Sequence, residues 1–100
     1  YRWLGKEKKE FVLAKQLLRS GTSIGANVEE AIGGQSERDF HAKMTIAYKE
    51  ARETRYWLRL LHDSDYIGDS AFESIIIDCN ELLKLLVSIT KTMKQRIRNS

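Results

Sequence analysis

Apolar side chains recur along this chain at alternating spacings of three and four residues, the period of one face of an α-helix. Three segments carry such a seam. The first seam runs from Phe11 to Ile32, the second from Phe40 to Leu61 and the third from Phe72 to Met93. Short polar or glycine-containing breaks separate the segments, so the pattern predicts three long helices joined by short loops.

The sequence also marks where these helices begin and end. We expect the first helix to run from about Lys8 to Ile32 and to stop at Gly33-Gly34, where glycine can satisfy the last carbonyls. Ser36 and Ser70 each precede an acidic residue by three positions and predict capped starts for the second and third helices. Helices joined by short loops pack antiparallel to their neighbours, so the expected fold is all-α. It is an antiparallel up-and-down helical bundle in one domain, residues 1–100.

The stretch SGTSIGANVEEAIGGQS, residues 20–36, places Gly21 and Gly25 on the first seam. A phosphate-binding P-loop would need GxxxxGK[ST] after a strand, and this stretch has neither the lysine nor a strand pattern before it. Two glycines inside a helix cost about 1 kcal/mol each relative to alanine. We therefore expect a neighbouring helix to approach closely at these glycines.

Composition fits this picture and narrows the class of protein. The 100 residues include no proline, 42% are hydrophobic and 31% are charged, a mixture that favours helix. No apolar run approaches the roughly 20 residues of a membrane span and no leader pattern opens the chain, so we expect a cytosolic protein without a membrane partner. Cys79 is the single cysteine, and its apolar neighbours predict a buried thiol.

Positive charge collects at the two ends of the sequence, although the net charge is only +3: residues 1–20 hold six basic and two acidic side chains, and residues 91–100 hold four basic and no acidic ones. On the second helix a ridge at spacings of four, three and four lies between two apolar strips, and it consists of Tyr48, Arg52, Arg55 and Arg59. The end of the third helix adds a basic tail, Lys91, Lys94, Arg96 and Arg98. Arginines along a helix can follow phosphates, so we predict binding of RNA or DNA. The alternative is that the arginines pair with acidic residues of neighbouring helices or subunits.

The second helix carries another apolar strip well separated from its seam, with Ile46, Trp57 and Leu60 as its large residues. A helix with two apolar faces needs two partners, and three helices in so small a domain cannot easily cover both. We predict that this strip is an oligomer interface. The rival interpretation is a structural protein–protein interaction module that binds no nucleic acid.

One side of the first helix carries a polar row, Arg19, Ser23, Asn27 and Glu30. A catalytic role for this row would need a nucleophile with a base, and nothing near His41 or His62 forms one. A network that fixes helix register is the favoured interpretation. Glu30, Glu50 and Glu53 are the carboxylates that a di-metal site could use, but no Glu-x-x-His tetrapeptide occurs. We therefore predict no enzymatic activity, no metal and no cofactor.

The segments RSGTSIGANVEEAIGGQSERDF and IAYKEARETRYWLRLL, with Ser23-Ile24, Asn27-Val28 and Glu30 at their core, resemble a known family. This family comprises the four-helix bundle proteins encoded within 23S ribosomal RNA intervening sequences. The resemblance covers nearly the whole chain and implies an antiparallel bundle that assembles into a pentameric ring. Relatives include the accessory variability determinant of diversity-generating retroelements, which implies nucleic acid and a protein such as a reverse transcriptase as partners.

The sequence departs from the family pattern in places. Lys49-Glu50 stands where many members have Gly-Ser, and Ala31 stands where glycine often follows the glutamate. Members usually carry a whole helix before the one expected from Lys8, whereas only Tyr1 to Leu4 precede Gly5 here. We expect a trimmed sequence in which the family's first helix is absent, leaving three long helices and a hydrophobic groove.

Overall fold

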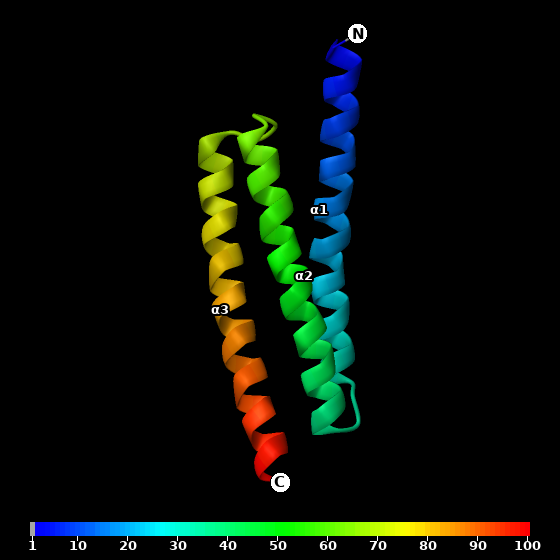
Figure 1. The fold of residues 1–100 in the computed structure, drawn as a ribbon, viewed down its shortest axis with the longest axis vertical. Coiled ribbons are helices and arrows are strands. Elements are labelled where there is room, and N and C mark those ends of the chain that lie inside the picture. Colours follow the sequence, from blue (N-terminus) through cyan, green and yellow to red (C-terminus); the bar gives the residue numbers. More distant parts are fainter. Residues whose placement is uncertain (1) are drawn as a thin grey trace.

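The computed structural model describes residues 2–100, with side chains from Gly5 onward, as three long helices. They are α1 (Arg2–Ile32), α2 (Glu37–Asp63) and α3 (Asp69–Asn99), each antiparallel to the next (Figure 1). The all-α architecture and the three long helices confirm the sequence prediction, except that α1 begins at Arg2 and not at about Lys8. Tyr1, and the chain that the family would place before it, lie outside the described residues.

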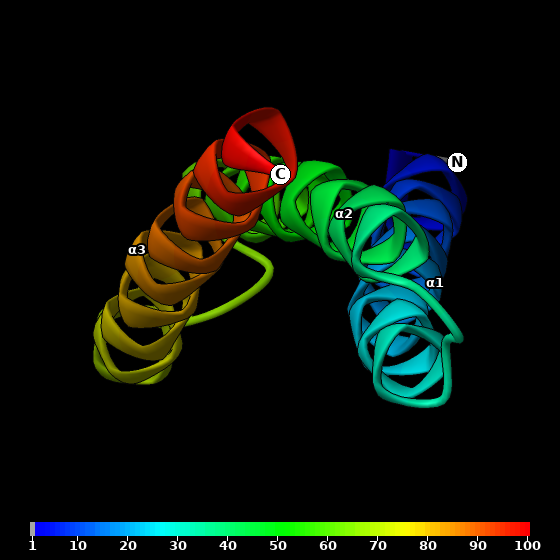
Figure 2. The same cartoon turned by 90° about the horizontal axis from the view of Figure 1, so that it is seen from below.

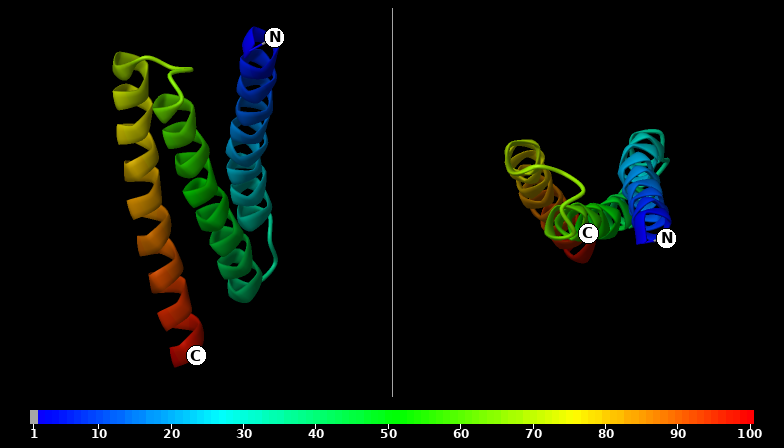
Figure 3. Two further views of the ribbon diagram at one scale, coloured as in Figure 1. Left: turned by 45° about the horizontal axis from the view of Figure 1, so that its top comes forward. Right: turned by 90° about the horizontal axis from the view of Figure 1, so that it is seen from above.

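The middle helix α2 holds the structure together. Both α1 and α3 pack on α2, but the described parts of α1 and α3 have no Cα atoms within 8 Å of each other. Figures 2 and 3 show that α1 and α3 lie on two sides of α2, so that the three helices form an open V with α2 at its apex. The seam predicted on α2 is confirmed, since Met44, Ala47, Ala51, Leu58 and Leu61 are all buried.

The seam predicted on α1 is confirmed at Val28, which packs against the core together with the neighbouring Ile24, but is wrong at most other positions. Phe11, Leu18 and Ile32 are 68%, 68% and 70% exposed, and no atom lies within 4 Å of a Cβ placed on Gly21 or Gly25. The face that packs on α2 is rotated from the predicted one and includes the buried Ser20 and Ala31. The close helix approach expected at the two glycines is therefore not made by the described residues.

The helix ends agree with the predicted caps in part. Ser36 Oγ accepts a hydrogen bond from the Asp39 backbone N–H at 3.0 Å, which confirms the predicted cap of α2. The capping box predicted at Ser70 is wrong, since α3 starts at Asp69 after Gly68 with no side-chain cap. On α3, Cys79, Leu86 and Met93 of the predicted seam are buried. The Cys79 thiol is thus in the core, as expected.

The end of α2 has a specific backbone geometry. The N–H groups of Asp65 and Tyr66 donate to the carbonyls of His62 and Leu61 at 3.0 and 2.9 Å. This is the Schellman pattern, which requires a left-handed residue just past the helix. Asp65 occupies that position with φ 62°. The turn sets the antiparallel return of α3 along α2.

Candidate nucleic-acid interface

The predicted basic ridge lies on the side of α2 that borders α3. Arg55 Nη1 donates to Asn80 Oδ1 of α3 at 3.3 Å, and Arg52 lies 5.9 Å from the centre of the Tyr48 ring. Arg52 and Arg59 are exposed, while Tyr48 and Arg55 are half-buried. The ridge is therefore a surface feature whose middle is anchored to α3 through an uncharged amide.

None of the three ridge arginines forms an ion pair with a carboxylate anywhere in residues 5–100. They border a shallow surface hollow of about 450 Å³, which is lined by Lys49, Arg52, Glu53, Arg55, Tyr56 and Arg59. Tyr56 is 57% exposed and packs edge-on against Trp57 with 4.9 Å between ring centres. Lys49 and Tyr56, which were not predicted for the ridge, thus lie beside it. Each precedes a ridge arginine by three residues, Arg52 and Arg59, and this spacing could have identified them.

The basic tail of α3 lies on the same side of the α2–α3 pair. Positions Asn80, Lys84, Val87, Lys91, Lys94 and Arg98 follow one another at spacings of four and three. They form one stripe of α3. Asn80 touches Arg55, so this stripe borders the ridge. Arg96 is on another face and forms an ion pair with Glu37. We call Tyr48, Arg52, Arg55, Arg59, Lys91, Lys94 and Arg98 together the basic track.

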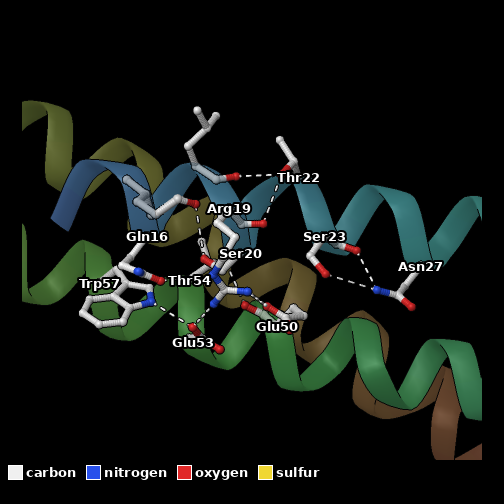
Figure 4. Close-up of polar contacts among 12 residues, drawn as sticks. Gln16, Arg19, Ser20, Thr22, Ser23, Asn27, Glu50, Glu53, Thr54 and Trp57 are labelled. Atoms are coloured by element: carbon white, nitrogen blue, oxygen red, sulfur yellow. Dashed lines mark hydrogen bonds and ion pairs between the residues drawn. The ribbon is translucent and has the colours of Figure 1, made fainter. Parts of the chain in front are cut away.

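The one carboxylate of the hollow is held by other groups. Glu53 Oε1 accepts from Trp57 Nε1 at 3.1 Å and forms an ion pair with Arg19 of α1 (Figure 4). The pKa of Glu53 is lowered, and the hydrogen bond from Trp57 is the largest cause. Burial acts in the opposite direction, while the hydrogen bond and the charge of Arg19 lower the pKa further. The negative charge beside the ridge is thus partly neutralised from α1.

The same contacts show what the polar row of α1 does. Arg19 Nη1 also lies 3.6 Å from Glu50 Oε2, and Glu30 pairs with Lys43 of α2 at 3.1 Å. Between them, Asn27 Nδ2 donates to the carbonyl and hydroxyl oxygens of Ser23, at 2.9 and 3.2 Å. The ends of the row therefore tie α1 to α2, and its middle stays within α1.

A buried hydroxyl pair lies beside this row and was not predicted from the sequence. Ser20, which is fully buried, places its Oγ 2.8 Å from Thr54 Oγ1 of α2. The two hydroxyls also reach the carbonyls of Leu17 and Glu50 in their own helices, at 3.2 and 2.8 Å. Ser20 lies outside the apolar seam predicted on α1, so no sequence pattern pointed to this contact.

The second apolar strip of α2 is only partly covered. Ile46 is 40% exposed, and Trp57 and Leu60 are half-buried. Leu60 borders a hollow of about 590 Å³ between the start of α1 and the turn after α2. The strip thus follows the outer groove between α1 and α2, on the far side of α2 from the basic track.

One of the two histidines, His62, has structural side-chain contacts. His62 stacks on Phe72 with ring centres 4.0 Å apart, and its Nε2 lies 2.7 Å from Asp69 Oδ1. Within the described residues, no three His, Cys, Asp or Glu side chains gather as a metal ion would need. None of the described helices has an apolar stretch sufficient to cross a membrane.

Comparison with known proteins gives the family. The 23S rRNA-intervening sequence protein family matches residues 2–88. A crystal structure from Bacteroides thetaiotaomicron, of a protein with unknown function from the S23 ribosomal protein family, has 56% sequence identity and a TM-score of 0.80. The match covers 91% of this chain and 84% of that one. No curated protein matches the chain. With most of its residues matched by the family, the chain belongs to the 23S rRNA-intervening sequence proteins.

Proposed function

We propose that this protein is a non-enzymatic, homo-oligomeric helical bundle that binds structured RNA or DNA through the basic track. The observation that carries the proposal is the set of unpaired arginines on α2. Arg52, Arg55 and Arg59 have no carboxylate partner in residues 5–100. Charges left free on one helix face are available to phosphates, which is the strongest sequence-independent attraction in nucleic-acid binding.

The length of the basic track supports the same proposal. Arg96 pairs with Glu37, so the end of α3 lies beside the start of α2. The track therefore extends from Arg59 to about the level of Glu37, some 22 residues along α2, or roughly 33 Å at 1.5 Å per residue. This is close to one turn of a nucleic-acid duplex, about 34 Å. The exposed Tyr56 offers a ring for stacking on an unpaired base.

Assembly would strengthen binding. A single track with few cations binds weakly at physiological salt, whereas several tracks on one particle add avidity without any new kind of contact. The exposed strip with Ile46 and the half-buried Trp57 and Leu60 supports assembly, since apolar surface of this kind favours interfaces.

The test is the binding of a labelled RNA hairpin, a DNA duplex and a DNA single strand across a salt series. The variant Arg52→Gln/Arg55→Gln/Arg59→Gln removes three phosphate contacts. Its log–log salt slope should fall by about 2.7 on duplex DNA or about 2.1 on a single strand, with weaker affinity on all sequences. Circular dichroism should show unchanged helix content, because these side chains make no buried ion pair.

The control removes the same charge elsewhere. Lys15→Gln/Lys43→Gln/Arg96→Gln also takes the net charge from +3 to zero, but two of its positions are already paired with Glu30 and Glu37. This control should keep most of the affinity and slope. Equal behaviour of the two triple variants would remove the basic track from the proposal.

The second candidate function is a structural module that recruits a protein through the Trp57 strip. It is favoured by the exposure of Ile46. Under this alternative Trp57→Ala changes oligomer mass or partner affinity, while the arginine variant has no effect on any binding. Absence of nucleic-acid binding even at low salt would select it.

A further inference from the structure

The start of α1 and the turn after α2 form an apolar hollow with a basic rim. It has a volume of about 590 Å³ and is lined by Gly5, Lys8, Lys9, Val12, Leu13, Leu60, Ser64 and Tyr66. The Tyr66 hydroxyl donates to the Lys6 carbonyl at 3.1 Å, which fixes the turn against α1. Both acidic residues of this segment, Glu7 and Glu10, fall on the opposite side of α1 from Val12. The hollow therefore presents aliphatic surface beside two exposed ammonium groups.

The outer face of α3 carries the complementary pattern. Ile77 is 57% exposed, and the exposed Glu73 and Glu81 lie one turn before and one turn after it on the same stripe. Residues 69–81 hold four acidic residues and no basic one. The first cation on this helix is Lys84, two turns beyond Ile77. An aliphatic side chain thus stands between two carboxylates, about 12 Å apart along the axis.

The two surfaces cannot meet within one chain. The described parts of α1 and α3 lie on different flanks of α2 (Figure 3) and have no Cα atoms within 8 Å of each other. A second copy can bring them together, with its α3 against the α1 of the first. The contact joins unlike surfaces, so each copy keeps one free hollow and one free α3 face, and further copies can add until a ring closes.

We propose that the hollow at Val12, Leu13 and Leu60 receives Ile77 from a second copy of this chain, with Lys8 and Lys9 facing Glu73 and Glu81. Charge complementarity selects this occupant, because the basic rim would repel the basic second half of α3 and the basic track. Leu60 belongs to both the hollow and the second apolar strip of α2. The inference rests on the proposed homo-oligomer and names the surfaces that form it.

Sedimentation equilibrium at low and moderate salt tests the interface. Lys8→Glu/Lys9→Glu and Glu73→Lys/Glu81→Lys should each raise the dissociation constant of assembly at least tenfold, because like charges then face one another. The four changes combined in one chain restore opposite charges and should return the constant to within about threefold of the wild-type value. Ile77→Asp should also dissociate the assembly. The control Ile32→Asp, at the far end of α1 and 70% exposed, should not.

The outcomes separate this inference from the broader proposal. If the wild-type chain is an oligomer and both charge-reversal variants keep its mass, the interface is overturned while the proposed assembly stands. The same holds if the chain with all four changes fails to restore the wild-type mass. A wild-type chain that is monomeric at every concentration overturns both and leaves a foreign protein as the occupant of the hollow. The basic track is tested separately by the arginine variant described above, since none of these interface changes touches Arg52, Arg55 or Arg59.

Discussion

Removing the buried hydroxyl pair between α1 and α2 is the sharpest test of how α1 packs. Ser20 is fully buried, and its Oγ lies 2.8 Å from Thr54 Oγ1. The variants are Ser20→Ala, Thr54→Val and the double variant. Each single change removes one partner of the shared hydrogen bond, and each remaining hydroxyl still has a carbonyl of its own helix within reach, that of Leu17 or Glu50.

The size of the effect follows from this arrangement. A net hydrogen bond contributes about 1 kcal/mol, and the remaining partner is spared the full cost of an unpaired group because a carbonyl is in reach. Each single variant should therefore lose about 1 kcal/mol. The shared bond can be lost only once, so the double variant should also lose about 1 kcal/mol. The coupling energy is then about 1 kcal/mol, above the few tenths expected for independent sites.

Urea unfolding followed by circular dichroism gives the three free energies of unfolding. Protein concentration must be held fixed, since assembly would add to the apparent stability. A loss of 1 kcal/mol corresponds to a fall in Tm of about 4–8 °C for a domain of this size. Strictly additive losses would show that Ser20 and Thr54 do not meet, and would refute this packing of α1 on α2.

Four further predictions address the helix ends, the core and the α1–α2 ion pair. Asp65→Gly should stabilise the protein by about 1 kcal/mol in urea unfolding, because Asp65 has φ 62° and glycine adopts that conformation without strain; a loss would contradict the Schellman turn. Ser36→Ala should cost about 1 kcal/mol by the same measurement, since Ser36 caps α2, and no change would mean that another group satisfies the Asp39 N–H. Leu58→Ala should cost about 2–5 kcal/mol, as Leu58 is completely buried, whereas the exposed Leu85 should tolerate alanine with a loss well below that; equal losses would contradict the core. The pKa of Glu53 is lowered, so its contribution to stability is present above the ordinary glutamate pKa of about 4.3 and is lost as pH falls through the lowered value. Glu53→Gln should therefore reduce the loss of unfolding free energy on acidification, measured by urea unfolding at several pH values; an unchanged loss would assign it to other carboxylates.

Much of the fold was predictable from local pattern. The seam of α2 and the cap at Ser36 were predicted correctly, because helical period and capping chemistry act over a few residues. The start of α3 was not, since the turn built around Asp65 brings the chain into helix at Asp69 rather than after Ser70. That turn depends on hydrogen bonds back to α2, which spacing alone does not encode.

The candidate site, too, could be predicted from the sequence only in part. The ridge on α2 follows from the spacing of Arg52, Arg55 and Arg59, and a sequence can place residues on one face of one helix. Whether acidic side chains would neutralise that ridge was open in the sequence, because residues 36–65 hold six acidic and six basic side chains. In the tertiary structure the acidic residue nearest the ridge, Glu53, pairs with Arg19 of α1 and not with a ridge arginine.

By itself, the sequence determined three amphipathic helices, the all-α class, the family and the faces on which the basic residues lie. The tertiary structure decided which face of α1 packs on α2. Its apolar seam and the face with Ser20 are adjacent on the same helix, and period cannot choose between them. Contacts between residues 34 positions apart made that choice, through Ser20 with Thr54 and Arg19 with Glu53. The contact of Arg55 with Asn80 likewise decided that the α3 stripe with Lys91, Lys94 and Arg98 borders the ridge, because a helix fixes its own stripes but not those of its neighbour.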